Sequence, residues 1–401
     1  MSCAATLDEG GGLRLAARKG PSLVALFREH GTAYVAKHSL TSEQGRLLDS
    51  IRDCRTAALG GRLYVCDACG VALPLYNSCR NRHCPACQAL DQARWIAARE
   101  ERILPVGHHH VVFTLPAELR PLARRHAKAI YALLFEAASK TLELLARETL
   151  GAQLGVTAVL HTWTRELLFH PHVHCVVSAG GLSLDGARWV PRERFLFPVA
   201  RMKAVFRGRI LKGLERLRTE GRIALDDAAW RTLLRSLPKM RKWVVYAEAP
   251  FGRSTHVIRY LGRYTHRIAI SDARLLSIDA CGVTFRTRGD DRTTLPPEEF
   301  LRRFLMHVLP RGFHKIRHFG LYGGQAVNGR LALARTLLGE GDGGDLDNDA
   351  LEGDADPEQV DDWASLLEQL TGESPLVCPV CGQGRLMLQP QLIPRAPRRP
   401  P

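Results

Sequence analysis

The sequence predicts an α+β protein in which a sheet rich in antiparallel strands is backed by helices. Segments with strand and helix patterns follow one another in the order β, α, β, β, α, β, α from residue 108 to residue 267. The chain has 401 residues, 45% of them hydrophobic, which is enough for two or three domains with a sizeable core. Residues 60–90 are instead dense in Cys, Gly, Asn and Pro and cannot build an apolar core of their own.

The expected elements can be placed in chain order. Residues 20–58 have apolar positions at helical spacing and predict short helices. Residues 108–116 predict a strand, and residues 126–150 a long amphipathic helix. The later elements expected are strands at 155–163, 172–181 and 242–250, helices at 199–218 and 254–267, and a hairpin at 274–288 that turns near Ala280, Cys281 and Gly282.

Charge is distributed unevenly along the chain. The formal net charge is +15, yet 13 of the 41 acidic residues lie between Thr336 and Gly384, where there is no Lys or Arg. The rest of the chain carries 56 basic against 28 acidic residues. A body this basic favours a polyanionic partner, of which nucleic acid is the commonest, although a soluble protein with a basic surface fits the charge equally well.

The sequence gives no sign of a membrane or export segment. No stretch approaches the ~20 continuous apolar residues of a membrane span, and the first residues lack the layout of a signal peptide. The expected location is therefore the cytoplasm, where thiols stay reduced. The eleven cysteines are then better interpreted as metal ligands or core residues than as disulfides.

Cysteine spacing predicts a structural zinc site. Two C-x-x-C pairs, with a 14-residue spacer between them, can fill the four positions of a tetrahedral ion: Cys66, Cys69, Cys84 and Cys87. Further candidate ligands are Cys54, Cys79, His83 and a third pair beyond the acidic segment, Cys378 and Cys381. The third pair either recruits partners from Cys54, Cys79 or His83 or binds nothing. Arg80 and Arg82, in the loop between the first two pairs, are candidate DNA contacts.

Three histidines alternate along an expected strand: His170, His172 and His174. Alternate side chains of a strand share a face, so two imidazoles can converge on one divalent ion. Two protein ligands leave coordination positions open, which is typical of a catalytic site. Histidines at this spacing also occur without any metal, so the pattern alone is weak.

Two tyrosines supply a candidate nucleophile. Tyr260 and Tyr264 lie one turn apart on the expected helix, beside a parallel row of Arg259, Arg263 and Arg267. Tyrosines next to arginines provide what attack on a phosphodiester requires, a nucleophile and charge stabilisation. An aromatic pair packed into the core is the alternative interpretation.

Together these motifs resemble the two-tyrosine HUH transposases of rolling-circle insertion sequences. The resemblance rests on LHTW, LLFHPHVHCVVSAGG and YLGRY, and extends to CRTAALGG, YNSCRNRHCPACQ, VVFTLP, LPRGFHKIRHFGLY and CPVCG. It implies an N-terminal zinc-binding region ahead of an HUH nuclease fold. It also implies His172 and His174 as ligands of a catalytic Mg²⁺ or Mn²⁺, and Tyr260 and Tyr264 as nucleophiles. The third ligand stays open between His256, His170 and His161.

One position departs from the family pattern. Family members commonly carry Gly-Gln after His-Thr-Trp, and Thr164-Arg165 stands there in this chain. If that glutamine holds the metal or the DNA, this copy is weakened or inactive.

The resemblance also implies a domain order and an activity. The expected segments are an N-terminal helical part (1–60), a zinc ribbon (61–98), the HUH domain (100–335), an acidic linker (336–375) and a C-terminal knuckle with a basic tail (376–401). The implied activity is rolling-circle transposition: metal-dependent cleavage of single-stranded DNA at element ends and target, and strand transfer through a 5′-phosphotyrosine. The sequence has no P-loop motif, so unwinding is expected from a host helicase or replication.

Three other functions remain open at this stage. A rolling-circle replication initiator or relaxase would share the chemistry and differ in the DNA recognised. A zinc-dependent DNA-binding protein without catalysis, or an inactive transposase copy, would retain the cysteines.

Overall fold

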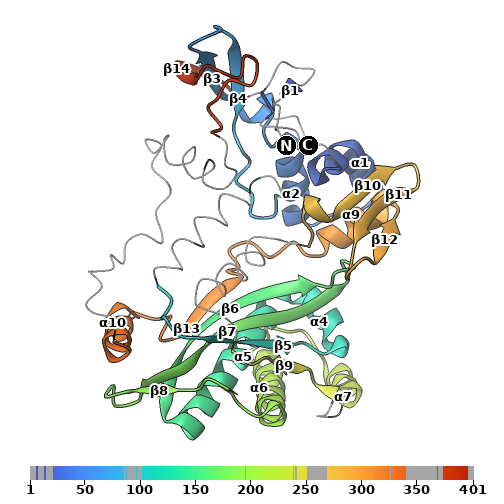
Figure 1. Ribbon diagram of the computed structural model, residues 1–401. Helices are drawn as coiled ribbons and strands as arrows, with labels where there is room; N and C mark the ends of the chain where they lie inside the picture. The colour runs from blue at the N-terminus through green and yellow to red at the C-terminus, as the bar shows by residue number, and fades with distance from the viewer. Residues whose placement is uncertain are drawn as a thin grey trace. The chain divides into compact units, whose positions relative to one another are not determined.

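The computed structural model describes residues 6–7, 13–14, 21–84, 87, 96, 102–194, 196–237, 239, 242–250, 269–325, 327–339, 368 and 374–395. The chain divides into two compact units. Unit 1 comprises Met1–Arg94, His266–Val308 and Glu352–Pro401, and unit 2 comprises Trp95–Thr265 and Leu309–Leu351 (Figure 1). Each unit is thus built from separate stretches of sequence, and each has the predicted α+β character.

Unit 2 is built on a six-stranded sheet in which the observed pairings are all antiparallel. The strands run in the order β13-β6-β7-β5-β9, and β8 pairs with part of β7. Their bounds are β5 (His108–Thr114), β6 (Ala152–Trp163), β7 (Phe169–Ser183), β8 (Trp189–Pro191), β9 (Val245–Ala247) and β13 (Ile316–Gly320). The expected antiparallel sheet is therefore present, with the two longest strands side by side near its centre.

Helices cover one face of this sheet (Figure 1). They are α4 (Arg120–Arg125), preceded by the short turn η2 (Ala117–Leu119), α5 (Ala127–Leu150) and α6 (Val199–Thr219). Helix α7 (Asp227–Ser236) contacts α6, where Arg218 lies over the ring of Trp230. In β7, Val173 and Cys175 are fully buried, whereas the alternate residues His172 and His174 are partly exposed. Since α4 and α5 contact β7, the histidines lie on the face away from these helices. A further helix, α10 (Val327–Leu337), packs through Leu331 with Leu104 and Leu321 in a smaller cluster.

Unit 1 joins the N-terminal helices to a later part of the chain. Helices α1 (Leu23–Lys37) and α2 (Ser42–Asp53) belong to this unit together with η1 (Ala57–Leu59), η4 (Asp272–Arg274), the strands β10 (Leu275–Asp279), β11 (Gly282–Arg286) and β12 (Arg292–Leu295), and α9 (Pro297–Leu305). Phe27 of α1 meets Phe304 of α9 edge to face, with ring centroids 5.1 Å apart. The backbone N–H of Leu23 donates to a carboxylate oxygen of Asp272. Helix α1 therefore shares a core with a segment that lies more than 200 positions later in the chain.

The rest of unit 1 contains a three-stranded sheet in the order β14-β3-β4. A hairpin of β3 (Gly61–Cys66) and β4 (Ala72–Tyr76) receives the C-terminal strand β14 (Leu386–Ile393) along β3. A short pair, β1 (Thr6–Leu7) and β2 (Leu13–Arg14), completes the described strands. Residues 61–76 and residues 386–393, far apart in the sequence, thus form one sheet.

Most expected elements are present, and the hairpin turns at Ala280 and Cys281 as predicted. The helix expected at 254–267 and the acidic segment from residue 340 onward lie outside the described residues. Among the described elements, the sequence did not reveal the strands β1, β2, β3, β4, β8, β12, β13 and β14, the helices α4, α7, α9 and α10, or the short turns η2 and η4.

Candidate functional site

Three histidines of unit 2 form a group with the geometry of a metal site. One ring nitrogen each from His161, His172 and His174 lie within 4.8 Å of one another. His161 is on β6, directly opposite His172 in the pairing with β7. Facing residues of an antiparallel pair project from the same side of the sheet, so the rings converge.

A shift of register brings His161 onto this face. Trp163 pairs with Phe169, whereas His161 pairs with His172, so β7 has one extra residue between these two pairs. Without that bulge, His161 would face Pro171 and would project from the opposite side of the sheet from His172.

Hydrogen bonds orient the two imidazoles of the His-x-His pair. Nδ1 of His172 lies 2.6 Å from the carbonyl oxygen of His170, to which an Nδ1–H can donate. Nδ1 of His174 lies 2.8 Å from Nε2 of His110, and Nδ1 of His110 lies 3.5 Å from a carboxylate oxygen of Glu248. In both rings, Nδ1 is the nitrogen that makes this contact. Such outer partners fix the tautomer of metal-binding histidines.

Burial keeps these imidazoles neutral near pH 7. Desolvation lowers the pKa of His172 to about 4 and holds the pKa of His174 well below its usual value. The pKa of His110 is also lowered, mainly by burial, against an opposing effect of Glu248. A neutral imidazole offers a lone pair, so His172 and His174 can bind a divalent ion without first losing protons.

The other candidate ligands have different positions. His170 is not in the group of three. Its Nδ1 lies 2.7 Å from a guanidinium nitrogen of Arg120, and this positive group lowers the pKa of His170, after the larger effect of burial. His256 lies outside the described residues. Of the open candidates for a third ligand, His161 is the one that the structure places with His172 and His174.

The predicted nucleophiles and their arginines belong to a segment outside the described residues. They are Tyr260, Tyr264, Arg259, Arg263 and Arg267. The Thr164-Arg165 departure lies in the turn between β6 and β7, where the Thr164 hydroxyl accepts hydrogen bonds from the backbone N–H groups of Glu166 and Leu168.

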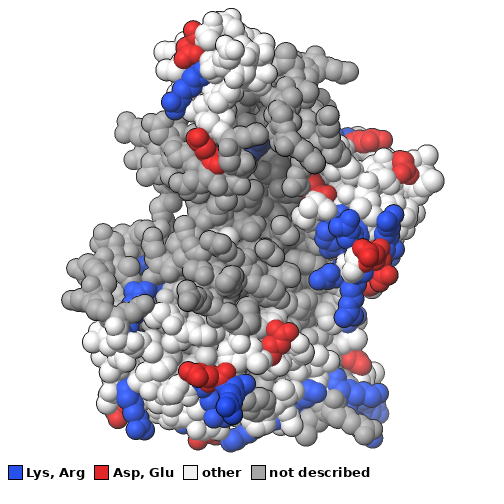
Figure 2. All heavy atoms as spheres, viewed as in Figure 1, with Lys and Arg blue, Asp and Glu red and all other residues white. Residues whose placement is uncertain are grey.

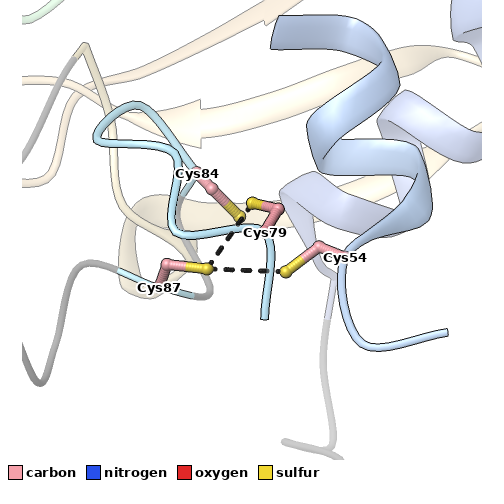
Figure 3. A group of neighbouring side chains, drawn as sticks. All are labelled: Cys54, Cys79, Cys84 and Cys87. Carbon is pink, nitrogen blue, oxygen red and sulfur yellow. Dashed lines mark hydrogen bonds between the residues drawn. The ribbon is translucent and has the colours of Figure 1, made fainter. Parts of the chain in front are cut away.

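Four cysteines of unit 1 form a first thiol group: Cys54, Cys79, Cys84 and Cys87. Figure 3 shows their sulfur atoms pointing toward one another from the end of α2 and from the loop after β4. The sulfur of Cys87 lies 3.5 Å from that of Cys54 and 3.6 Å from that of Cys79. The thiols of Cys54 and Cys79 lower the pKa of Cys87, which favours its thiolate form.

A second thiol group contains the C-terminal pair: Cys66, Cys69, Cys378 and Cys381. The prediction of one ribbon site formed by Cys66, Cys69, Cys84 and Cys87 is therefore wrong in its grouping. The hairpin explains the difference. Cys66 and Cys69 lie at the turn of β3 and β4, whereas Cys79 to Cys87 follow the opposite end of β4, about 16 Å away at the usual rise per residue.

The remaining residues predicted near these sites belong to neither thiol group. His83 is buried, and its ring contacts the side-chain oxygen of Asn81. Arg80 is exposed in a left-handed conformation, whereas burial lowers the pKa of the partly buried Arg82. In Figure 2, Lys and Arg side chains are spread over both units with acidic groups among them.

Comparison with known proteins identifies the family. Residues 155–329 match the family described as "Putative transposase", and residues 26–115 match "Transposase zinc-binding domain". The putative transposase y4qJ of Sinorhizobium fredii is 41% identical over 389 residues, covering 92% of this chain and 95% of the relative. The transposase for insertion sequence element IS801 of Pseudomonas savastanoi pv. phaseolicola is 29% identical over 282 residues, or 67% of each chain. No solved structure matches the chain.

The chain is a DNA-processing protein with a zinc-binding domain. It belongs to the family of insertion-sequence transposases that includes the IS91 and IS801 types. The zinc-domain match and the cysteine groups support structural zinc. Within the part of the chain that the structure describes, no helix has the length and apolar character needed to cross a bilayer.

Proposed function

We propose that this transposase cleaves single-stranded DNA at element ends and target, and transfers the strand through a covalent bond between DNA and a tyrosine. The observation that carries the proposal is the convergence of His161, His172 and His174 on one face of the central sheet. Family membership favours a transposase over a replication initiator or relaxase.

The donor set fits a divalent ion of the kind that assists phosphoryl transfer. Three imidazole ligands suit Mn²⁺ better than Mg²⁺, whose preferred ligands are oxygens, so phosphate and water oxygens would complete the shell. An ion bound there would withdraw charge from an oxygen of the scissile phosphate. His110 and Glu248 hold the ring of His174 in orientation through the contacts described above.

The tyrosines are proposed as nucleophiles on the basis of their sequence. The phenol oxygen of Tyr260 or Tyr264 would form a bond to phosphorus while the bond to the 3′-oxygen breaks, which leaves a 5′-phosphotyrosine and a 3′-hydroxyl. A free phenol is a weak nucleophile, with a pKa of about 10, so positive charge must offset the charge that develops. Two tyrosines allow one to hold a DNA end while the other cleaves.

The first thiol group is proposed as the structural zinc site of the family's zinc-binding domain. All four of its cysteines fall within the matched residues 26–115. Its sulfur–sulfur distances of 3.5 and 3.6 Å approach the edge of about 3.8 Å expected for a tetrahedron with Zn–S bonds of about 2.3 Å.

A covalent-adduct experiment tests the proposed activity. Labelled single-stranded oligonucleotides from both ends of the element are incubated with the protein, and products are separated on a denaturing gel. We expect an adduct that EDTA abolishes and added Mn²⁺ or Mg²⁺ restores without zinc. The double variant Tyr260→Phe/Tyr264→Phe should form none, whereas Tyr76→Phe, in the zinc-binding region, should behave as the wild type. An adduct that persists in the double variant would place the nucleophile elsewhere, and the absence of any adduct with the wild type would favour a non-catalytic protein.

A further inference from the structure

Two knuckles of the same design face each other in unit 1. One has the sequence CDACG at residues 66–70 and the other CPVCG at residues 378–382. In each, the glycine after the second cysteine has a left-handed backbone, with φ of 69° at Gly70 and 70° at Gly382. In each, that glycine's N–H donates to the carbonyl oxygen of the first cysteine. The two turns therefore present their thiols in the same way, although Cys69 and Cys378 are 309 positions apart in the sequence.

The four sulfur atoms are spaced as a tetrahedral ion requires. The sulfur of Cys66 lies 3.7 Å from that of Cys381, and the sulfur of Cys69 lies 3.8 Å from that of Cys378. Zn–S bonds of about 2.3 Å place the sulfurs of a tetrahedron about 3.8 Å apart. All four cysteines are free thiols. Each contact joins a thiol of one knuckle to a thiol of the other, so neither knuckle is complete without its partner.

Backbone hydrogen bonds and close packing hold the sulfur atoms of this group in position. The N–H of Cys69 donates to the sulfur of Cys66, and the N–H of Gly384 donates to the sulfur of Cys381. A Cβ added at Gly384 would lie 2.4 Å from the sulfur of Cys66, so only glycine fits there. Hydrogen bonds from backbone N–H groups favour sulfur atoms that carry negative charge, as metal-bound thiolates do.

Apolar packing alone contributes little to the stability of the C-terminal strand on the hairpin. Among the described residues, the buried core shared by the hairpin and the C-terminal segment consists of Tyr64, Cys66, Leu73, Cys378 and Leu386, with the partly buried Val71, Leu75, Leu376 and Cys381 packed against it. Cys66 and Cys378 of this buried core are themselves thiols of the second group. On β14, Met387 and Leu392 are 50% and 65% exposed. A bound ion would supply the stability that so small a core lacks.

We propose that Cys66, Cys69, Cys378 and Cys381 bind a second structural zinc ion, which fastens the C-terminal strand to the N-terminal hairpin. This site is separate from the first thiol group and lies partly outside the matched zinc-binding domain. It does not depend on the proposed nuclease activity. The ion would link the two knuckles and so close the long segment between them into a loop. This second zinc site is called the clasp below.

Zinc counting on the full-length protein tests the clasp. After dialysis against a weak chelator, elemental analysis of the wild type should give two zinc ions per chain. The double variant Cys378→Ser/Cys381→Ser should retain one, and so should Cys54→Ser/Cys79→Ser. Cys281→Ser, which removes an exposed thiol outside both groups, should retain two. A wild type with one zinc, or a Cys378→Ser/Cys381→Ser variant that keeps two, would overturn the proposal.

Hydrogen exchange supplies a second measurement, which does not require the variants to be stable. In the wild type, zinc removal should raise the exchange of residues 386–393 at least tenfold, and zinc alone should restore it. Unchanged exchange of this strand would contradict the clasp. The covalent-adduct assay separates this outcome from the failure of the proposed activity, because a missing second zinc leaves the histidine group intact.

Discussion

His161 and His170 are both neighbours of the His172/His174 pair, but their surroundings differ. His161 is 3% exposed and faces His172 across two paired strands. His170 is directed at the guanidinium group of Arg120, which would repel a cation. The two residues therefore offer a matched comparison for the metal site.

We expect His161→Ala to weaken Mn²⁺ binding at least about tenfold, because loss of a ligand should cost no less than loss of an outer partner. His170→Ala should leave the affinity nearly unchanged. Titration of free Mn²⁺ by electron paramagnetic resonance measures both, and circular dichroism checks that the variants fold. An equal loss in the two variants would show that His161 has no special role.

Sequence reasoning found part of this site. The His-x-His spacing is a local signal and predicted His172 and His174 as candidate ligands. His161 remained one of several candidates because its position depends on pairing and on the bulge between Trp163 and Phe169. Neither the turn at Thr164–Leu168 nor the extra residue in β7 has a residue pattern that fixes the register.

At the scale of elements, α5 and α6 approach closely through a glycine. A Cβ at Gly213 of α6 would lie 2.0 Å from a methyl carbon of Leu133, which is 3% exposed on α5. Gly208, five residues earlier on the same helix, has no heavy atom within 4 Å of such a Cβ. The close contact lies in the layer that supports the sheet and its histidines.

Replacing each glycine by alanine should separate packing from helix propensity. Gly208→Ala should raise the free energy of unfolding by about 0.5–1 kcal/mol, because alanine favours a helix. Gly213→Ala should be less stable than Gly208→Ala by about 1–3 kcal/mol, because Leu133 must move in a packed core. Urea unfolding followed by tryptophan fluorescence measures both. Equal stability would mean that α5 and α6 adjust freely.

The predicted elements are those with strong periodicity. The long amphipathic α5 and the strands of the central sheet were readable for that reason. Strand β13 was not, because all five of its residues are half-buried and no alternation marks it. Strand β14 contains Pro390 and exposes several apolar residues. Its sequence therefore resembles an unstructured terminal segment and not a strand. Its strand form depends on β3, which is far away in the sequence.

At the scale of the whole molecule, the two thiol groups and most of the tryptophans lie in different units. Both thiol groups lie in unit 1, and five of the six tryptophans belong to unit 2. Unit 2 has a large apolar core that includes Phe113, Phe135 and Phe206, whereas the hairpin region of unit 1 has a small one. The two units should therefore respond differently to the loss of metal.

A strong zinc chelator should unfold the hairpin region and leave unit 2 folded. Hydrogen exchange should rise in β3, β4 and β14 at a chelator concentration that leaves the tryptophan emission maximum unchanged. A red shift of the emission in parallel with exchange would show instead that unit 2 also depends on zinc.

The contiguous order of segments expected from the sequence conceals how unit 1 is assembled. Residues 21–84, 269–308 and 374–395 contribute to it, because Phe304 packs on Phe27 and β14 pairs with β3. These contacts join apolar and backbone groups hundreds of residues apart, and no local pattern identifies the partners.

The position of β14 at the far end of the chain has a consequence for protein synthesis. A nascent chain can bring Cys54, Cys79, Cys84 and Cys87 together early in translation, but β3 must wait for its last partner until the ribosome has added some 300 further residues. Until then, the thiols of Cys66 and Cys69 lack the second knuckle. They compete for zinc ions with the cysteines of the first thiol group. A product shortened by a premature stop codon would keep the edge of β3 unpaired. Proteases would then cleave it more readily than the full-length transposase.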